Sequence, residues 1–176
     1  MHLRRLLCVL LLCGATPALA ATDADLENRL RAAFLLNFAK FVSWTPEQFA
    51  TSTSPLDFCL QENDPVAPAL VAMARGKLIE SHTLRVRRLE APLRWDGCHV
   101  AYVGALDSGQ VAQVFAELSG KPVLTVHESG QTLPGGVIRL FVQEHKLRFE
   151  VNTAAAERGA LRLSSKLMGL ALLVHV

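Results

Sequence analysis

The sequence predicts a three-layer α/β sandwich, with a mostly parallel sheet, an antiparallel edge hairpin and helices on its faces. Three observations lead to this fold class. Strand-like apolar runs alternate with helical segments between residues 56 and 128. Two alternating runs then flank a short polar turn around Glu144-His145-Lys146, which is typical of a hairpin. Helical patterns precede the first strand and follow the hairpin.

The first helix is expected over residues 23–43, where apolar side chains recur close to the helical period, and Trp44 and Pro46 end it. We interpret its phenylalanine face as core, with a dimer seam as the alternative. A short apolar run at 56–60 predicts a strand. A second helix is expected over 65–78, with Asp64 as its N-cap and Pro65 at its first position.

The remaining elements follow from alternating runs and turn signals. They are strands at 82–90, 98–104 and 121–128, a helix capped by Asp107-Ser108 that runs to about Leu118, the hairpin at 137–152, and a final helix at about 153–173. Gly159 and Gly169 weaken that last helix and predict a break or a close packing point within it.

The first 20 residues have the features of a secretory signal peptide. Arg4 and Arg5 form a basic region, residues 6–13 are apolar but too few to span a bilayer, and Ala18-Leu19-Ala20 is a small-x-small cleavage site. A buried helix or an uncleaved anchor is the alternative. We therefore predict export from the cytoplasm, with residues 21–176 as one α/β domain long enough for a sizeable core.

Cleavage changes the charge balance. The leader holds two of the 18 Lys and Arg, so 16 remain against 16 Asp and Glu. A formally neutral domain has no long-range field to attract nucleic acid or acidic lipid. No second apolar run of about 18 residues follows the leader, so we expect no membrane span in the mature chain.

Two of the four cysteines also leave with the leader, and Cys59 and Cys98 remain. An even pair in an oxidising compartment predicts a disulfide. The loop it closes has about forty residues, which corresponds to roughly 4 kcal/mol in the chain-entropy model. The alternative is two buried thiols more than about 7 Å apart. Cys59 lies late in its strand and Cys98 at the start of its own, so parallel neighbours in simple register would hold them apart.

Several segments together resemble the YfiR family of exported proteins. They are "RAAFLLNFAKFVSW", "GCHVAYVG", "PVLTVHESG" and "GGVIRLFVQEHKLRFEVNTAAAERGALRLSSKLMGLA". The similarity covers about Leu30 to Leu173 and has no catalytic signature.

The resemblance implies an α/β fold and a periplasmic repressor, often a homodimer. Such a repressor binds the periplasmic sensory domain of an inner-membrane diguanylate cyclase, and an outer-membrane lipoprotein can sequester it. Cys59 and Cys98 match the family's paired, redox-linked cysteines. A second cysteine pair, present in some members near the loop before the "GG" strand, is absent here.

The chain offers no motif for an enzyme, a metal site or a cofactor site, and we predict none of these. Ser164 and Lys166 are two residues apart, whereas a serine–lysine dyad needs both on one helical face. We interpret them as a capping or packing feature. The sequence has no H-x-x-x-H and no C-x-x-C. His99, in an apolar run, is expected to be a satisfied core histidine.

The family resemblance also implies that the "FEVN" region and the start of the following helix serve partners. We take Glu150, Asn152, Arg158 and Ser164 as candidate partner-binding residues. Arg158 and Arg162 are possible ion-pair partners of Glu150, while the alternative reading places Glu150 on a solvated strand face.

Two functional hypotheses follow. The first is a periplasmic protein that represses a diguanylate cyclase, and so lowers cyclic-di-GMP and biofilm formation, in a way that responds to redox state. The second is an exported sensor domain that binds a small ligand and serves a histidine kinase or an uptake receptor. The sequence alone does not separate these two.

Overall fold

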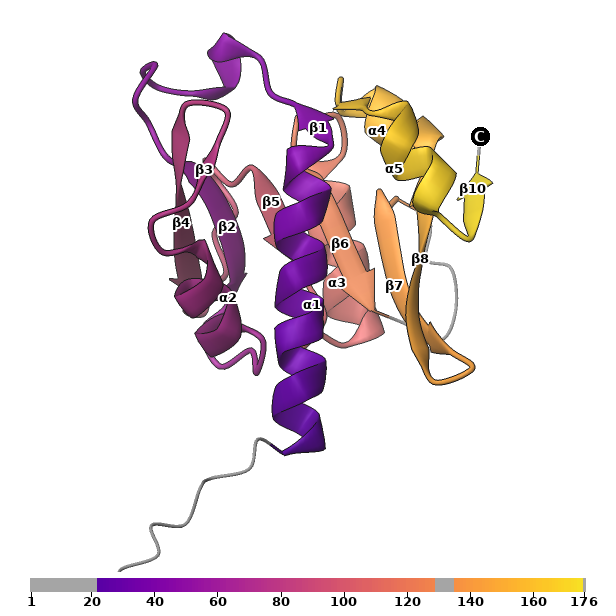
Figure 1. Cartoon of the computed structure of the whole chain (residues 1–176). Helices are drawn as coiled ribbons and strands as arrows, with labels where there is room; N and C mark the ends of the chain where they lie inside the picture. Colours follow the sequence, from indigo (N-terminus) through magenta and orange to yellow (C-terminus); the bar gives the residue numbers. More distant parts are fainter. Residues whose placement is uncertain (1–21, 129–134, 176) are drawn as a thin grey trace, which may run out of the picture.

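The computed structural model describes residues 22–128 and 135–175 as a three-layer α/β arrangement around one large sheet (Figure 1). The predicted leader, residues 1–20, lies outside the described residues. The helices are α1 (Asp23–Lys40), α2 (Ala67–Ala74), α3 (Ser108–Leu118), α4 (Thr153–Arg158) and α5 (Ser165–Leu170), with a 3-10 turn η1 at Pro46–Gln48. The strands are β1 (Val42–Ser43), β2 (Leu56–Gln61), β3 (Leu78–Ile79), β4 (His82–Leu89), β5 (Val100–Tyr102), β6 (Leu124–Glu128), β7 (Ile138–Gln143), β8 (Lys146–Asn152), β9 (Arg162–Leu163) and β10 (Leu173–His175).

The large sheet has the spatial order β10-β8-β7-β6-β5-β2-β4-β3. Its five central strands, from β4 to β7, are parallel. The hairpin β7–β8 is antiparallel, as predicted, and β10 adds a parallel strand beyond it. The fold class expected from the sequence is therefore confirmed.

Two apolar layers form on opposite faces of this sheet. Helix α1 runs across one face with α2 beside it, and α3 covers the other (Figure 1). On the first face, Phe38 of α1 packs edge-on against Phe149 of β8 at a centroid distance of 4.9 Å. Phe34 contacts both rings, so this part of the phenylalanine face is core. Trp95, fully buried, and Phe115 of α3 belong to the other layer.

Local capping explains two of the helix starts. Thr22 and Asp25 form a capping box at the start of α1, and Asp107 with Gln110 forms another at α3, where the sequence predicts the cap. Helix α2 starts later than predicted. Asp64 accepts a hydrogen bond from the backbone N–H of Val66 at 2.9 Å, but this closes a turn that precedes the helix.

Helix α1 ends at Lys40, three residues before the predicted end. The next residues form β1, in which Val42 pairs with Leu163 of β9. The indole N–H of Trp44 donates to the carbonyl of Ala39 and so satisfies one acceptor in the last turn of the helix. Strand pairing with a distant segment thus overrides helical periodicity here.

The single helix predicted at 153–173 is wrong. The segment folds as α4, β9, α5 and β10. The break at Gly159 is confirmed, because α4 ends at Arg158 and Gly159 is its C-cap. Gly159 is also a close packing point, because a Cβ there would lie 2.6 Å from the Lys121 carbonyl oxygen. Ala160 follows with φ of 53°, and Ser164 then caps α5. Gly169 has open space around it and causes no break.

Candidate functional site

The topology of the parallel strands selects one place for a ligand site. The five parallel strands are β2, β4, β5, β6 and β7, and we number them 1 to 5 in this chain order. Their spatial order in the sheet is then 2-1-3-4-5, so that β2 and β5 are neighbours. The connection from β2 to β4 carries α2 on the α1 face, and that from β5 to β6 carries α3 on the opposite face. The chain therefore leaves the carboxyl ends of β2 and β5 in opposite directions. Ligands of doubly wound sheets bind outside the strand ends at such a switch point.

A hollow of about 350 Å³ lies at this switch point, and we call it the switch-point cavity. Its walls come from the first half of α1, the β2–α2 turn, the end of β5 with the following turn, and the last residue of β6. Its polar side chains are Glu27, Asn28, Arg31, Asp64, Tyr102 and Glu128.

Glu128 anchors a hydrogen-bond network in this cavity. The Nε of Arg31 donates to both carboxylate oxygens of Glu128, at 2.8 and 3.0 Å, and an Nη donates to Glu27 at 3.0 Å. The buried Tyr102 hydroxyl also donates to Glu128. Burial and the Glu128 charge raise the pKa of Tyr102, so the phenol stays protonated as a donor. Gly104 makes room for it, since a Cβ there would clash with the hydroxyl.

Asp64 is a nearly buried carboxylate in the same cavity, with 3% of its surface exposed. Burial raises its pKa to about 6, and the nearby Glu128 charge adds to the shift. The hydrogen bond from the Val66 N–H opposes this shift. The carboxylate is therefore ionised at neutral pH in a position that disfavours its charge.

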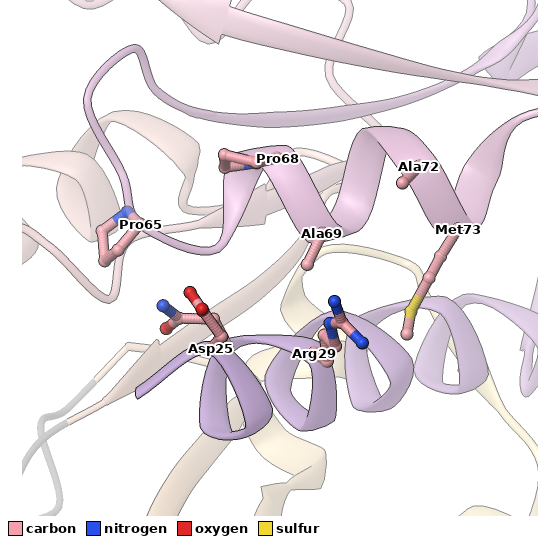
Figure 2. Close-up of a pocket in the computed structure, with 8 residues that line it drawn as sticks. Asp25, Arg29, Pro65, Pro68, Ala69, Ala72 and Met73 are labelled. Carbon is pink, nitrogen blue, oxygen red and sulfur yellow. The ribbon is translucent and has the colours of Figure 1, made fainter. Parts of the chain in front are cut away.

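A larger hollow of about 530 Å³ adjoins the cavity between α1 and α2. Figure 2 shows Asp25 and Arg29 on α1 facing the short side chains of α2, among them Ala69 and Ala72. Small residues on the facing helix leave this space open. Asn28 and Pro65 line both hollows, so the two lie next to each other along α1.

The sequence analysis missed this cluster, although part of its signal was present. Asp64 follows the first predicted strand and Glu128 ends the strand predicted at 121–128, whereas Tyr102 lies inside the strand predicted at 98–104 and ends β5 only in the structure. Polar residues at the carboxyl ends of parallel strands are a sign of a site. Nothing in the sequence marked Arg31 as a site residue, because a position in a helix does not show which strand end lies opposite it.

Cys59 and Cys98 form the predicted disulfide, with their Cα atoms 5.8 Å apart. Cys98 precedes β5 and belongs to a turn in which its N–H donates to the Trp95 carbonyl. This turn lies against β2 and β4, because Arg87, the register partner of Cys59, donates to the Asp96 carbonyl at 2.8 Å. The register difficulty therefore disappears, since Cys98 approaches from outside the strand ladder. Both cysteines are buried in the α3 layer.

A second buried carboxylate lies near the amino ends of the same strands. Asp57 of β2 accepts two hydrogen bonds from Arg85 of β4, at 2.6 and 2.7 Å. His99 accepts from the Asp57 N–H through Nδ1 and lies 3.1 Å from the Gln48 carbonyl through Nε2. Burial lowers the pKa of His99, against the pull of the Asp57 charge. The expectation of a satisfied core histidine is confirmed.

The candidate partner-binding residues separate into different places. Glu150, on β8, is buried rather than solvated, and its ion-pair partners are Arg139 at 2.8 Å and His175 at 3.2 Å, not the expected Arg158 or Arg162. The Arg139 guanidinium, helped by His175, holds the pKa of Glu150 below its ordinary value. The pairing follows from register, because Arg139 lies directly opposite Glu150.

The other three candidates lie on the C-terminal segment. Asn152 shares a small hollow with Glu150 and accepts from the Ala155 N–H as the N-cap of α4. Ser164 is the N-cap of α5, which agrees with its interpretation as a capping residue. Arg158 is exposed at the end of α4 and lies beside a different hollow. The structure thus groups Glu150 with Asn152 and leaves Arg158 and Ser164 apart from them.

Two further properties bear on function. Within residues 22–128 and 135–175, no group of three or more His, Cys, Asp or Glu side chains is arranged to hold a metal ion. No helix in these same ranges combines the length and apolar character of a membrane span.

Comparison with known families matches the chain to the YfiR/HmsC-like family over residues 28–172. This span includes every described strand except β10 (Leu173–His175). The family is one of non-catalytic periplasmic regulators in the cyclic-di-GMP pathway. The protein belongs to the YfiR/HmsC-like family and is, at that level, a regulator in this pathway.

Proposed function

We propose that this protein is a periplasmic repressor of an inner-membrane diguanylate cyclase. It binds the cyclase's periplasmic sensory domain, favours the inactive state and so lowers cyclic-di-GMP and biofilm formation. The observation that carries this proposal is the family match over residues 28–172. A repressor of this kind shifts the cyclase only by the difference between its affinities for the two states.

The proposal includes export and assembly. The basic, apolar and cleavage-site features of residues 1–20 support secretion through a cleavable leader. The mature chain then acts as a homodimer, and an outer-membrane lipoprotein competes with the cyclase for it. An oxidising periplasm maintains the Cys59–Cys98 bond.

Among the candidate partner-binding residues, Arg158 is the one that we place at the contact with the cyclase. Its side chain is exposed, whereas Glu150 is engaged in buried ion pairs and Asn152 and Ser164 cap helices. An exposed arginine is available to pair with an acidic partner surface, and arginine is enriched among residues that dominate binding energy.

The test is a gene deletion with complementation. Deletion in a strain that retains the cyclase should raise cyclic-di-GMP, and the wild-type gene should restore the original level. The variant Arg158→Glu should fail to restore it. Arg94→Glu, which reverses another exposed arginine in the segment between β4 and β5, should restore it and serves as the matched control. An unchanged cyclic-di-GMP level after deletion would contradict repression.

Redox response is the second part of the proposal. Reduction of Cys59–Cys98 removes a constraint between β2 and the turn before β5, which weakens the repressor and releases the cyclase. Because both cysteines are buried, a reductant reaches them only after local opening. The dissociation of the purified complex in the presence and absence of reductant measures this response.

The switch-point cavity favours a second candidate function. An exported small-ligand sensor that serves a histidine kinase or an uptake receptor would need such a cavity at a strand end. The neighbouring gene separates the two candidates. A membrane protein with periplasmic and diguanylate cyclase domains supports repression, whereas a kinase or a receptor supports sensing.

A further inference from the structure

We propose that the switch-point cavity is a binding site for a small organic dication, of the class of the aliphatic diamines. The cavity lies where the connections from β2 and β5 leave the sheet toward opposite faces. This position is the usual ligand site of doubly wound sheets. Nothing in the proposed repressor function requires it, so the proposal stands on the geometry of this site.

The charges that line the cavity specify a cation. Three carboxylates, Glu27, Asp64 and Glu128, face one guanidinium, that of Arg31. Counted as ionised groups at neutral pH, they leave an excess of two negative charges. A dication neutralises this excess, and the partly enclosed position strengthens its attraction relative to bulk water.

Arg31 is poorly placed to bind an anion. Its Nε is shared between both oxygens of Glu128, and an Nη donates to Glu27. An anionic ligand would have to break these charge-assisted hydrogen bonds before it gained new ones. The arginine instead holds Glu128 at the end of β6, with the Tyr102 hydroxyl as a second donor.

Asp64 is the group that gains most from a bound ammonium. It is an almost fully buried carboxylate, and the nearest opposite charge, Arg31, is already engaged by Glu128. The raised pKa of this carboxyl shows that its backbone hydrogen bonds and the Arg31 charge compensate its burial only in part. An ammonium in hydrogen-bond contact would supply that compensation.

Size and wall chemistry favour a short alkyl chain between the charged ends. A volume of about 350 Å³ is near the lower end of the range for small-molecule pockets. Ala24, Pro65, Val66 and Ala105 supply apolar wall for methylene groups. A metal ion is the less suitable cation, because no three acidic or imidazole side chains in the described residues converge on one point.

The experiment is calorimetric titration of the oxidised mature protein with putrescine at pH 7.5 and low salt. We expect saturable binding with one molecule per chain. Succinate has the same number of carbons and the opposite charge, and 1,4-butanediol is neutral, so neither should bind. Absence of putrescine binding at millimolar concentration would overturn the proposal, as would equal binding of the diol.

Three variants locate the site. Asp64→Asn should weaken binding at least tenfold, because a charge-assisted contact is lost. Ala24→Phe, at an exposed helix position on the cavity wall, should block binding without touching the buried network. Glu157→Gln removes one negative charge on α4, outside this cavity, and should leave binding unchanged. Undiminished binding by Ala24→Phe would overturn the assignment even if Asp64→Asn failed to fold.

The pH dependence supplies an independent check. Asp64 faces Glu27 and Arg31 of α1, Tyr102 of β5 and Glu128 of β6, and its pKa is about 6. At pH 5 about nine-tenths of this carboxyl is protonated, so the affinity should be about tenfold lower than at pH 7.5. Equal affinity at both pH values would show that Asp64 is not the anchor. Because binding is measured on the isolated protein, its outcome is independent of whether repression occurs.

Discussion

A buried carboxylate lies at each end of the parallel sheet, and the two differ in the charged groups around them. Near the amino ends, Asp57 is matched by Arg85, with Arg87 at 3.8 Å. At the carboxyl ends, Asp64 shares a cavity with two other carboxylates and a single arginine, Arg31, which is already engaged. In the first arrangement the carboxylate is paired with arginine. In the second, the carboxylate lines a hollow in which three carboxylates face one arginine.

From this difference we infer that the amino ends of the strands stabilise the fold, whereas the carboxyl ends are available for binding. The buried Trp95, Cys98 of the disulfide and the stacked rings of Phe49 and His82, whose centroids are 3.6 Å apart, lie at or near the amino ends. The burial of Asp64, whose charge is compensated only in part, is a cost to the free protein. Groups that stability alone does not explain are candidates for function.

The largest expected effect is loss of the disulfide. Reduction should lower the free energy of unfolding by roughly 4 kcal/mol, because the bond closes a loop with a sequence separation of 39. The melting temperature should fall by about 10 °C. Calorimetry with and without reductant measures this, and the double variant Cys59→Ala/Cys98→Ala should melt at the lower temperature in both conditions. An unchanged melting temperature with free thiols confirmed would show that the amino end does not depend on this bond.

Asp57→Asn tests the matched carboxylate. The change removes the charge that holds Arg85, and it should cost about 2 kcal/mol, since hydrogen bonds to charged groups are worth that much. The cost stays moderate because the exposed Arg85 can be rehydrated. Urea unfolding at pH 7.5 measures it. Asp64→Asn is the paired control and should not destabilise, so equal losses in the two variants would contradict the comparison.

At the carboxyl end, the difference in free energy of unfolding between the wild type and Asp64→Asn should change with pH. The direction should be opposite to that expected for a carboxylate paired with an arginine. The folded pKa of Asp64, about 6, lies above its unfolded value of about 4, so the folded state binds more protons between these pH values. The stability of the wild type should therefore fall relative to the variant as the pH rises from about 4 to about 6. Because the cavity that this carboxyl lines is open to water, we expect roughly 1.5 kcal/mol, less than the full shift implies. A constant difference between pH 4 and pH 7.5 would rule out the shift.

The smallest effect is expected for Tyr102→Phe. The ring keeps its packing in the α1 layer, and Glu128 loses the phenolic donor but keeps Arg31. Loss of one such hydrogen bond should cost about 1 kcal/mol, measured by urea unfolding. A loss as large as that of Asp57→Asn would mean that the carboxyl end also has a structural role.

Local patterns predicted the elements with self-contained signals. The hairpin was recognisable because both strands alternate and the turn between them is short, and Glu144 and His145 adopt the positive φ angles that such turns require. Asp107 was recognisable as a cap because a capping box lies within four residues. Parity and compartment predicted the Cys59–Cys98 bond, although not the turn that makes it geometrically feasible.

Strand pairing between segments far apart in the sequence determined the elements that local patterns did not predict. Residues 153–173 have helical composition, yet β9 forms there because Val42–Ser43 lies alongside it, and β10 forms because the edge of β8 is available. The same holds for the sites. The sequence left a solvated strand face as the alternative for Glu150, but only sheet register showed that Arg139 lies opposite Glu150 and pairs with it in a buried position.

By itself, the sequence determined the α/β class, the hairpin, the disulfide partners and the family, because these depend on residue types and spacings within short segments. Only the tertiary structure decided the order of the strands and thus the location of the switch point. Asp64, Tyr102 and Glu128 stand at three separate strand ends, and Arg31 reaches them from a helix that precedes all three. Their meeting depends on which strands are neighbours, and backbone hydrogen bonds between distant segments fix that order without leaving a local trace in the sequence.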